Sequence, residues 1–135
     1  MTSSSATRPT TTTTRGSCRN SGGSSLRTAA PPLVVPVLVL AEAAHLIGSR
    51  LGPQTELRLL GTLARGELLA ERVRPRDWSR IAQLVTQYAD LPLGSADASV
   101  VAAAERLGIH RILTLDRRHF TVVRPAHIDA FELVP

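Results

Sequence analysis

The chain has 135 residues, of which 43% are hydrophobic and 3% aromatic, a length that suits one domain. Sixteen basic residues against eleven acidic ones give a net charge of +5, and every basic residue is arginine. Because lysine is absent, a lysine-containing phosphate loop and a Schiff-base enzyme site are excluded. The single cysteine, Cys18, excludes an internal disulfide, and no Cys/His spacing resembles a zinc site. We therefore expect a protein of the reducing cytoplasm.

The first 32 residues differ in composition from the rest. They carry four arginines and no acidic residue, and residues 1–28 include fifteen serines or threonines. Such a segment cannot offset the entropy of its own ordering, because it has almost nothing apolar to bury. We predict a disordered tail over residues 1–32 and a folded domain over residues 33–135. A weak, non-specific attraction of this tail for phosphates is an alternative role.

Strands and helices alternate from residue 33 onward. The expected strands cover residues 33–36, 67–73, 111–115, 121–123 and 131–134. The expected helices cover residues 37–51, 53–65, a stretch that Asp77 caps and that ends before Pro92, and 96–107. Strands separated by helices predict a parallel sheet with right-handed crossovers, in a three-layer α/β/α sandwich. The apolar stretch 33–40 is too short for a membrane helix, so we expect no membrane association.

Residue type and spacing also predict how these helices end and which faces they bury. Ser95 is placed to cap the last helix, and Gly66 and Gly108 stand at C-terminal cap positions. The clearest amphipathic pattern predicts one buried stripe made of Trp78, Ile81, Ala82, Val85, Tyr88 and Ala89.

Three acidic residues occupy positions that are typical of ligand-binding or metal-binding sites. Asp116 follows the strand 111–115, at the sheet edge where parallel α/β folds bind ligands, although it also suits a turn. Asp97 lies in the first turn of its helix, where the helix dipole alone would stabilise it. Glu42 has apolar residues three and four positions away, which indicates that its helix face is buried rather than solvated. A buried carboxylate is costly unless it has a partner or a cation. If the three converge, their oxygens suit Mg²⁺ or Mn²⁺ better than zinc.

Further polar residues surround these acids. Asp90, in the loop before the Asp97 helix, is a fourth candidate ligand or an ordinary loop residue. His45, one turn after Glu42, is more typical of a structural histidine. Arg117 and Arg118 come directly after Asp116. Their guanidinium groups would suit the phosphates of a phosphodiester held beside a metal ion, or they simply form a solvated surface.

Three segments together resemble PIN-domain ribonucleases, most closely the VapC-type toxins of bacterial toxin–antitoxin pairs. The segments are VPVLVLAE at 35–42, YADLPLGSADAS at 88–99 and TLDRRHF at 114–120, and the resemblance covers residues 33 to 135. It implies a PIN-like fold, an endoribonuclease that uses Mg²⁺ or Mn²⁺, a cognate antitoxin and frequent homodimers. By motif position it makes Glu42, Asp97 and Asp116 the catalytic and metal-binding acids, with Asp90 an occasional neighbour.

The sequence departs from the family in one place. The family begins with a central strand ending in a catalytic aspartate, whereas residues 1–32 contain no acidic residue. The expected fold is therefore PIN-like but incomplete at its N-terminus, with an open seam in the sheet. One hypothesis is that residues 1–32 are translated out of frame, since shifting serine and threonine codons by one base yields apolar residues and aspartates.

Three functions remain open at this stage. The first is metal-dependent cleavage of RNA, with Arg117 or Arg118 contacting phosphate and with activity impaired by the loss of the first acid. The second is a catalytically inactive module that binds an antitoxin-like partner. The third is a non-specific nucleic-acid binder acting through the arginines of the tail.

Overall fold

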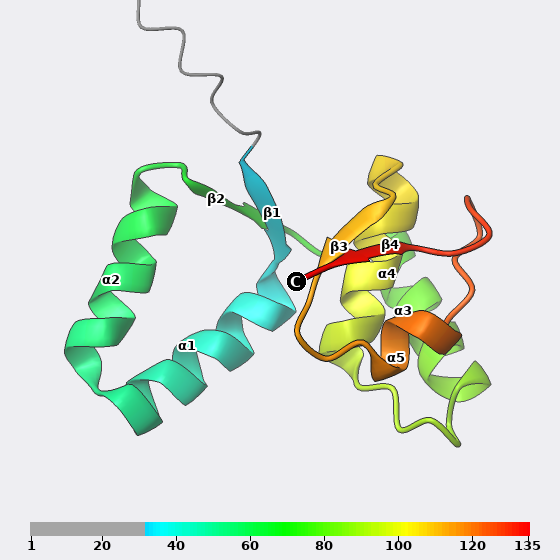
Figure 1. Cartoon of the computed structure of the whole chain (residues 1–135), viewed down its shortest axis with the longest axis horizontal. Helices are drawn as coiled ribbons and strands as arrows, with labels where there is room; N and C mark the ends of the chain where they lie inside the picture. Colours follow the sequence, from blue (N-terminus) through cyan, green and yellow to red (C-terminus); the bar gives the residue numbers. More distant parts are fainter. Residues whose placement is uncertain (1–31) are drawn as a thin grey trace, which may run out of the picture. The chain divides into compact units, whose positions relative to one another are not determined.

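The computed structural model describes residues 32–135 (Figure 1). The predicted disorder of the tail and the out-of-frame hypothesis concern residues that lie outside this range, apart from Pro32. In chain order the elements are β1 (Leu33–Pro36), α1 (Val37–Leu51), α2 (Pro53–Ala64), β2 (Leu68–Glu71), α3 (Pro75–Gln87), α4 (Ser95–Leu107), β3 (Arg111–Leu113), α5 (Arg118–Val122) and β4 (Glu132–Val134).

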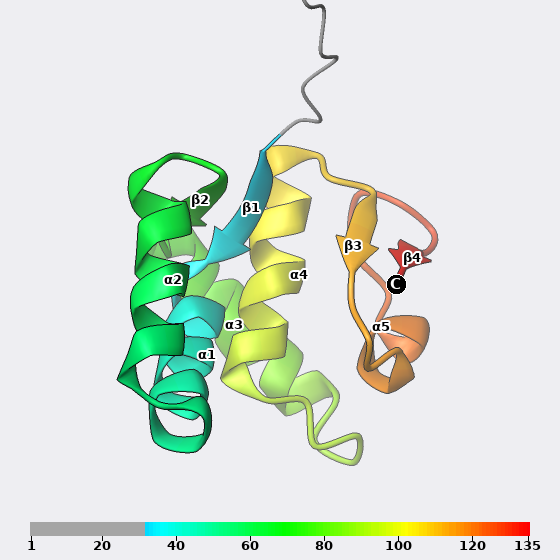
Figure 2. The same ribbon diagram turned by 60° about the vertical axis from the view of Figure 1, so that its left-hand side comes forward.

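The strands form parallel pairs, as expected for an α/β fold. β1 pairs with β2, with Leu33 opposite Leu68, and β3 pairs with β4, with Arg111 opposite Glu132. Within residues 32–135 these are two separate two-stranded sheets, which Figure 2 shows on either side of α4. The predicted α/β class with parallel strands is confirmed, and the open seam lies between β1 and β3.

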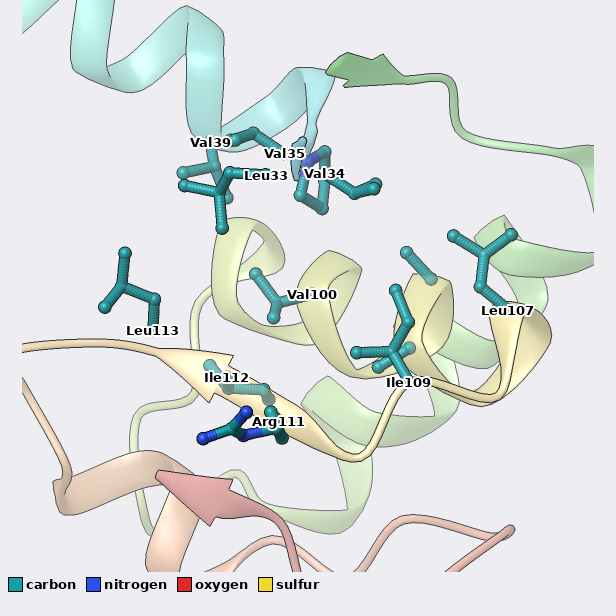
Figure 3. A pocket seen from close by; sticks show the side chains of 13 residues that line it. Leu33, Val34, Val35, Val39, Val100, Leu107, Ile109, Arg111, Ile112 and Leu113 are labelled. Atoms are coloured by element: carbon teal, nitrogen blue, oxygen red, sulfur yellow. The ribbon is translucent and has the colours of Figure 1, made fainter. Parts of the chain in front are cut away.

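A cavity of about 180 Å³ occupies this seam (Figure 3). Its apolar lining comes from β1, from α4 and from β3, and includes Leu33, Val35, Val100, Ile112 and Leu113. The amide of Glu132 donates to the carbonyl of His110 at 2.9 Å, and the amide of Thr114 donates to the carbonyl of Val134 at 3.0 Å. The backbone N–H and C=O groups of alternate residues in β3 therefore point toward β4. Those of Arg111 and Leu113 point away from β4.

Local chain chemistry explains where the first two helices meet. Gly52 has φ +86°, a conformation that side chains disfavour, and it separates α1 from α2. Pro53 then begins α2, where its missing N–H costs nothing. The two helices pack against each other, yet neither contains a fully buried residue. The predicted break at Gly52-Pro53 and the predicted bounds of α1 are confirmed.

The hydrophobic core lies in the second part of the domain. Its most deeply buried side chains are Leu84 in α3, Val101 in α4 and Val123 after α5. Small residues at 98, 99 and 102–104 make up most of the buried face of α4, and Gly108 ends α4 in the left-handed conformation at φ +66°. The predicted C-terminal cap at Gly108 is confirmed.

The predicted buried stripe of α3 is partly wrong. The helix begins at Pro75, and its buried residues are Asp77, Ile81 and Leu84. Trp78 is 52% exposed and Val85 also faces solvent. Packing against α4 selects this face, and an anchoring bond fixes it: the Nε of Arg106 in α4 donates to the Asp77 carboxylate at 3.1 Å. Asp77 is also not the N-cap residue, a position that Arg74 occupies. Asp77 is the third helical residue, and its Oδ2 accepts the backbone N–H of Arg74 at 2.9 Å.

Three further boundaries differ from the predictions. Residues 121–123, predicted as a strand, belong mostly to α5, because one helical turn buries Phe120 and Val123 on the same side. β3 ends at Leu113, and Leu115 is 92% exposed. Ser95 is the first helical residue of α4, and Gly94 takes the cap position. Among the described helices none has the length and apolar character needed to cross a membrane.

Candidate active site

Asp97 and His119 form the shortest polar contact among the candidate residues. Asp97 is the third residue of α4, and its Oδ2 lies 2.6 Å from Nδ1 of His119 in α5. Both side chains are partly exposed, Asp97 to 36% and His119 to 23%. A carboxylate that accepts a hydrogen bond from the Nδ1–H group fixes the orientation of the ring, and Nε2 makes no hydrogen bond with another described residue. The pair is therefore an oriented, accessible imidazole beside a carboxylate.

Asp116 lies in the loop between β3 and α5 and is held by Arg118. Its Oδ1 accepts the backbone N–H and the Nε of Arg118, both at 3.1 Å, and its Oδ2 accepts Nη2 at 2.8 Å. The hydrogen bonds from the Arg118 side chain and backbone, aided by the charges of Arg118 and His119, lower the pKa of Asp116 to about 2. This carboxyl group is ionised throughout the physiological range.

The start of α5 brings these two predicted acids into one neighbourhood. Asp116 contacts Arg118 and Asp97 contacts His119, and the two partners are consecutive residues. Glu42 does not join them, because it lies exposed on α1, where it makes no hydrogen bond or ion pair with another described residue. Asp90 is likewise exposed, in the turn after α3. The expectation that apolar neighbours would bury Glu42 is wrong, because the face of α1 that carries it is open to solvent.

The arrangement does not make a complete metal site. Carboxylate oxygens are the donors that Mg²⁺ and Mn²⁺ prefer. Nevertheless, in residues 32–135 no three Asp, Glu, His or Cys side chains gather closely enough to hold a metal ion. Asp116 is neutralised by Arg118, and Asp97 is engaged by His119. As they stand, these residues do not fit a bound divalent cation.

The two arginines predicted to contact phosphate both have partners within the protein. Arg117 precedes α5 and its Nη2 donates to the carbonyl of Leu133 at 2.8 Å, which ties the loop to β4. Arg118 holds Asp116. Both remain exposed at the surface.

Sequence reasoning missed the partner of Asp97. His119 stands three residues after Asp116, and only the packing of α5 beside α4 brings it to a residue 22 positions earlier. The position of His119, close in sequence to the candidate acid Asp116, was the available sequence signal. That signal could not identify Asp97 as the acid that the imidazole contacts, because the contact joins two helices.

Comparisons with known proteins now settle the family. The PIN domain profile matches residues 24–124. The chain belongs to the PIN-domain family. It is also 38% identical over 108 residues to Ribonuclease VapC26 of Mycobacterium tuberculosis, an alignment that covers 80% of each protein. The resemblance to VapC-type PIN ribonucleases that the three sequence segments indicated is confirmed.

Membership of the PIN family gives the site its chemical context. PIN nucleases generally use divalent metal ions, and Asp97 and Asp116 supply carboxylates of the kind these ions bind. The part of this PIN domain that the structure describes instead places a histidine and an arginine against those carboxylates. Both carboxylates are therefore occupied by partners within the protein.

Proposed function

We propose that this chain is a VapC-type endoribonuclease, a toxin that hydrolyses RNA phosphodiester bonds with Mg²⁺ or Mn²⁺ and that has reduced activity. The observation that carries the proposal is that Asp116 and Asp97 contact the consecutive α5 residues Arg118 and His119, in a chain 38% identical to a VapC ribonuclease. We expect reduced activity because Asp97 and Asp116 already have partners, His119 and Arg118, and no third acidic side chain of the described residues joins them.

In this proposal Glu42, Asp97 and Asp116 are the catalytic and metal-binding acids, with Asp90 as a further ligand, and cation binding requires Glu42 to approach the other two acids, which it does not do in the described structure. Arg117 and Arg118 contact RNA phosphates. Asp97 and Asp116 would hold the cation, which would activate water for attack on the phosphodiester, and Arg118 would contact phosphate beside Asp116, with which it is paired in the structure. The proposed partners are RNA, a cognate antitoxin protein and a second copy of the chain, in the cytoplasm.

The first experiment is an RNA cleavage assay with the full chain. The protein, shown to be folded by circular dichroism, is incubated with a structured RNA and Mg²⁺ or Mn²⁺, beside an Asp97→Asn variant and a sample containing EDTA. We expect slow cleavage that both controls abolish. Cleavage that persists in EDTA, or equal cleavage by the folded Asp97→Asn variant, would contradict metal-dependent hydrolysis at this site.

A second candidate function is a catalytically inactive PIN module that binds an antitoxin-like partner. The observation that favours it is that Asp116 is paired with Arg118 and Asp97 is hydrogen-bonded to His119, so both carboxylates already have partners within the protein. Titration calorimetry with Mn²⁺ separates the two functions, because only the nuclease requires the cation. A folded protein that binds no Mn²⁺ and cuts no RNA, yet binds a VapB-type antitoxin, would support the inactive module.

A further inference from the structure

A second charged surface lies at the opposite end of α4 from the acidic residues. Arg72 and Arg74 belong to the connection between β2 and α3, and Arg76 lies in the first turn of α3. All three side chains are exposed, and none pairs with a carboxylate of residues 32–135. A cavity of about 430 Å³ opens here, lined by Arg74, Pro75, Arg76 and Arg106.

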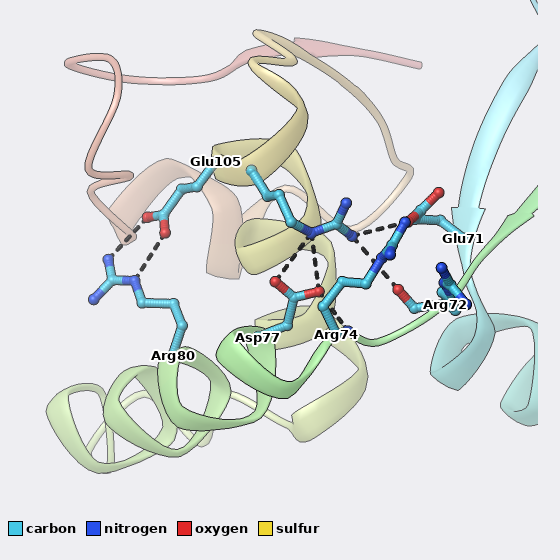
Figure 4. A network of polar contacts seen from close by, with 7 residues as sticks. Glu71, Arg72, Arg74, Asp77, Arg80 and Glu105 are labelled. Atoms are coloured by element: carbon cyan, nitrogen blue, oxygen red, sulfur yellow. Dashed lines mark hydrogen bonds and ion pairs between the residues drawn. The ribbon is translucent and has the colours of Figure 1, made fainter. Parts of the chain in front are cut away.

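The acidic groups near this surface already have partners (Figure 4). Arg106 donates its Nη2 to Glu71 at 2.9 Å and its Nε to Asp77 at 3.1 Å. Arg80 forms a two-point contact with Glu105, with both distances 2.8 Å. The surface holds five arginines (Arg72, Arg74, Arg76, Arg80 and Arg106) against three carboxylates (Glu71, Asp77 and Glu105), so a net charge of +2 remains. The surface therefore has an excess of positive charge available to an anionic ligand.

An exposed aromatic side chain lies one helical turn from Arg74. Trp78 follows Arg74 by four residues, and its backbone N–H donates to the Arg74 carbonyl at 3.4 Å, so the two lie one helical turn apart. The indole is 52% exposed, although it belongs to the largest apolar side chain in the sequence. An exposed ring one helical turn from an arginine without a carboxylate partner is a combination that suits single-stranded nucleic acid, with bases stacking and phosphates paired.

We propose that Arg72, Arg74, Arg76 and Trp78 form a binding site for single-stranded RNA, separate from the acidic residues at the start of α5. The arginines pair with phosphates and the indole stacks on a base. Along α4, nine residues separate Asp97 from Arg106, a rise of about 14 Å at 1.5 Å per residue. At a stacked spacing of roughly 3.4 Å, about four nucleotides cover that distance. The site rests on the proposed function, for which it would hold the substrate.

The test measures RNA binding in the absence of cleavage. A labelled single-stranded RNA of twelve nucleotides is titrated with the full chain in EDTA, and fluorescence anisotropy gives the affinity at several salt concentrations. The variant R72Q/R74Q/R76Q is compared with R50Q/R58Q/R124Q, which removes the same charge from exposed arginines elsewhere. We expect the first variant to bind about tenfold more weakly, with the salt slope reduced by about 2, and the control to lose less than about threefold.

The fluorescence of Trp78 gives an independent measurement of RNA binding, because Trp78 is the only tryptophan in the chain. Stacked RNA bases should quench its fluorescence on binding. Trp78→Leu should bind RNA about tenfold more weakly, whereas Trp78→Phe should keep most of the affinity, since phenylalanine retains a stacking face. Circular dichroism confirms that each variant is folded, which we expect because all four positions are exposed.

Each alternative outcome is distinct. Equal RNA affinity of the two triple variants, without quenching of Trp78, would overturn the proposal and assign RNA binding to another surface. Binding of polyglutamate but not of RNA would overturn it in favour of an acidic protein partner. Because the measurement needs no metal ion, RNA binding with no cleavage under any condition would contradict the nuclease function and leave this site standing.

Discussion

The two parts of the described domain are stabilised to very different extents. Residues 33–71, from β1 to β2, contain one buried residue, Pro36. Residues 77–131 hold the hydrophobic core, in which Leu84, Val101 and Val123 are completely buried. The contrast does not follow apolar content, because α1 is more apolar than α3 and buries less. Burial depends on what packs against a helix rather than on its composition alone.

The physical reason lies in the seam between β1 and β3. α3 and α4 pack against each other, and β3, α5 and Phe131 cover the other side of that core. By contrast, β1 has a neighbouring strand on the side of β2 but none of the described strands on the side of β3. Exposed apolar side chains in this first part include Leu33, Leu46, Leu51, Leu57 and Leu60. The first part therefore contributes less to the hydrophobic stabilisation of the domain.

The largest expected effect compares one leucine from each part. Leu84→Ala removes a completely buried side chain, and we expect it to lower the free energy of unfolding by about 2–5 kcal/mol. Leu57→Ala in α2, where the side chain is 58% exposed, should cost less than about 1 kcal/mol. Urea unfolding followed by circular dichroism measures both. Similar losses for the two variants would show that the two parts are equally packed in solution.

A smaller effect concerns the polar link between the two parts. Arg106 joins Asp77 of α3 to Glu71 of β2, and the Asp77 side chain is only 7% exposed. Asp77→Asn removes the charge that Arg106 requires, so we expect a loss of about 1–3 kcal/mol in unfolding free energy. Glu132→Gln is the control, because its pair with Arg111 is exposed and should contribute less than about 1 kcal/mol. Equal losses of unfolding free energy in Asp77→Asn and Glu132→Gln would contradict a larger contribution from the partly buried contact between Arg106 and Asp77.

The smallest effect concerns the pKa of Asp116, at the solvent-exposed edge of the second part. Arg118 holds the pKa of Asp116 at about 2, against an ordinary value of 3.8. Because the folded-state pKa is lowered, any stabilisation from this carboxylate is complete above its ordinary pKa and disappears as pH falls through about 2. Arg118→Gln should move the pKa back toward 3.8, as followed by NMR titration of the carboxyl carbon. An unchanged titration midpoint would show that Arg118 is not the cause.

Much of the fold was predictable because its signals are local. The bounds of α1, the break at Gly52-Pro53 and the end of α4 at Gly108 depend on the conformational preferences of glycine and proline. The parallel arrangement followed from the alternation of strands and helices. Of the site, the sequence indicated that Asp97 and Asp116 are near the carboxyl end of β3, where α/β folds bind ligands.

Tertiary packing decided the rest. The face of α3 that is buried depends on contacts with α4, so Trp78 is exposed although its spacing predicted burial. Residues 121–123 are mostly helical because one turn places Phe120 and Val123 in the same core. The contact between Asp97 and His119 joins two helices that are distant in sequence. Local preferences are properties of a few neighbouring residues, whereas burial and charge pairing depend on which elements meet in space, and only the folded arrangement determines that.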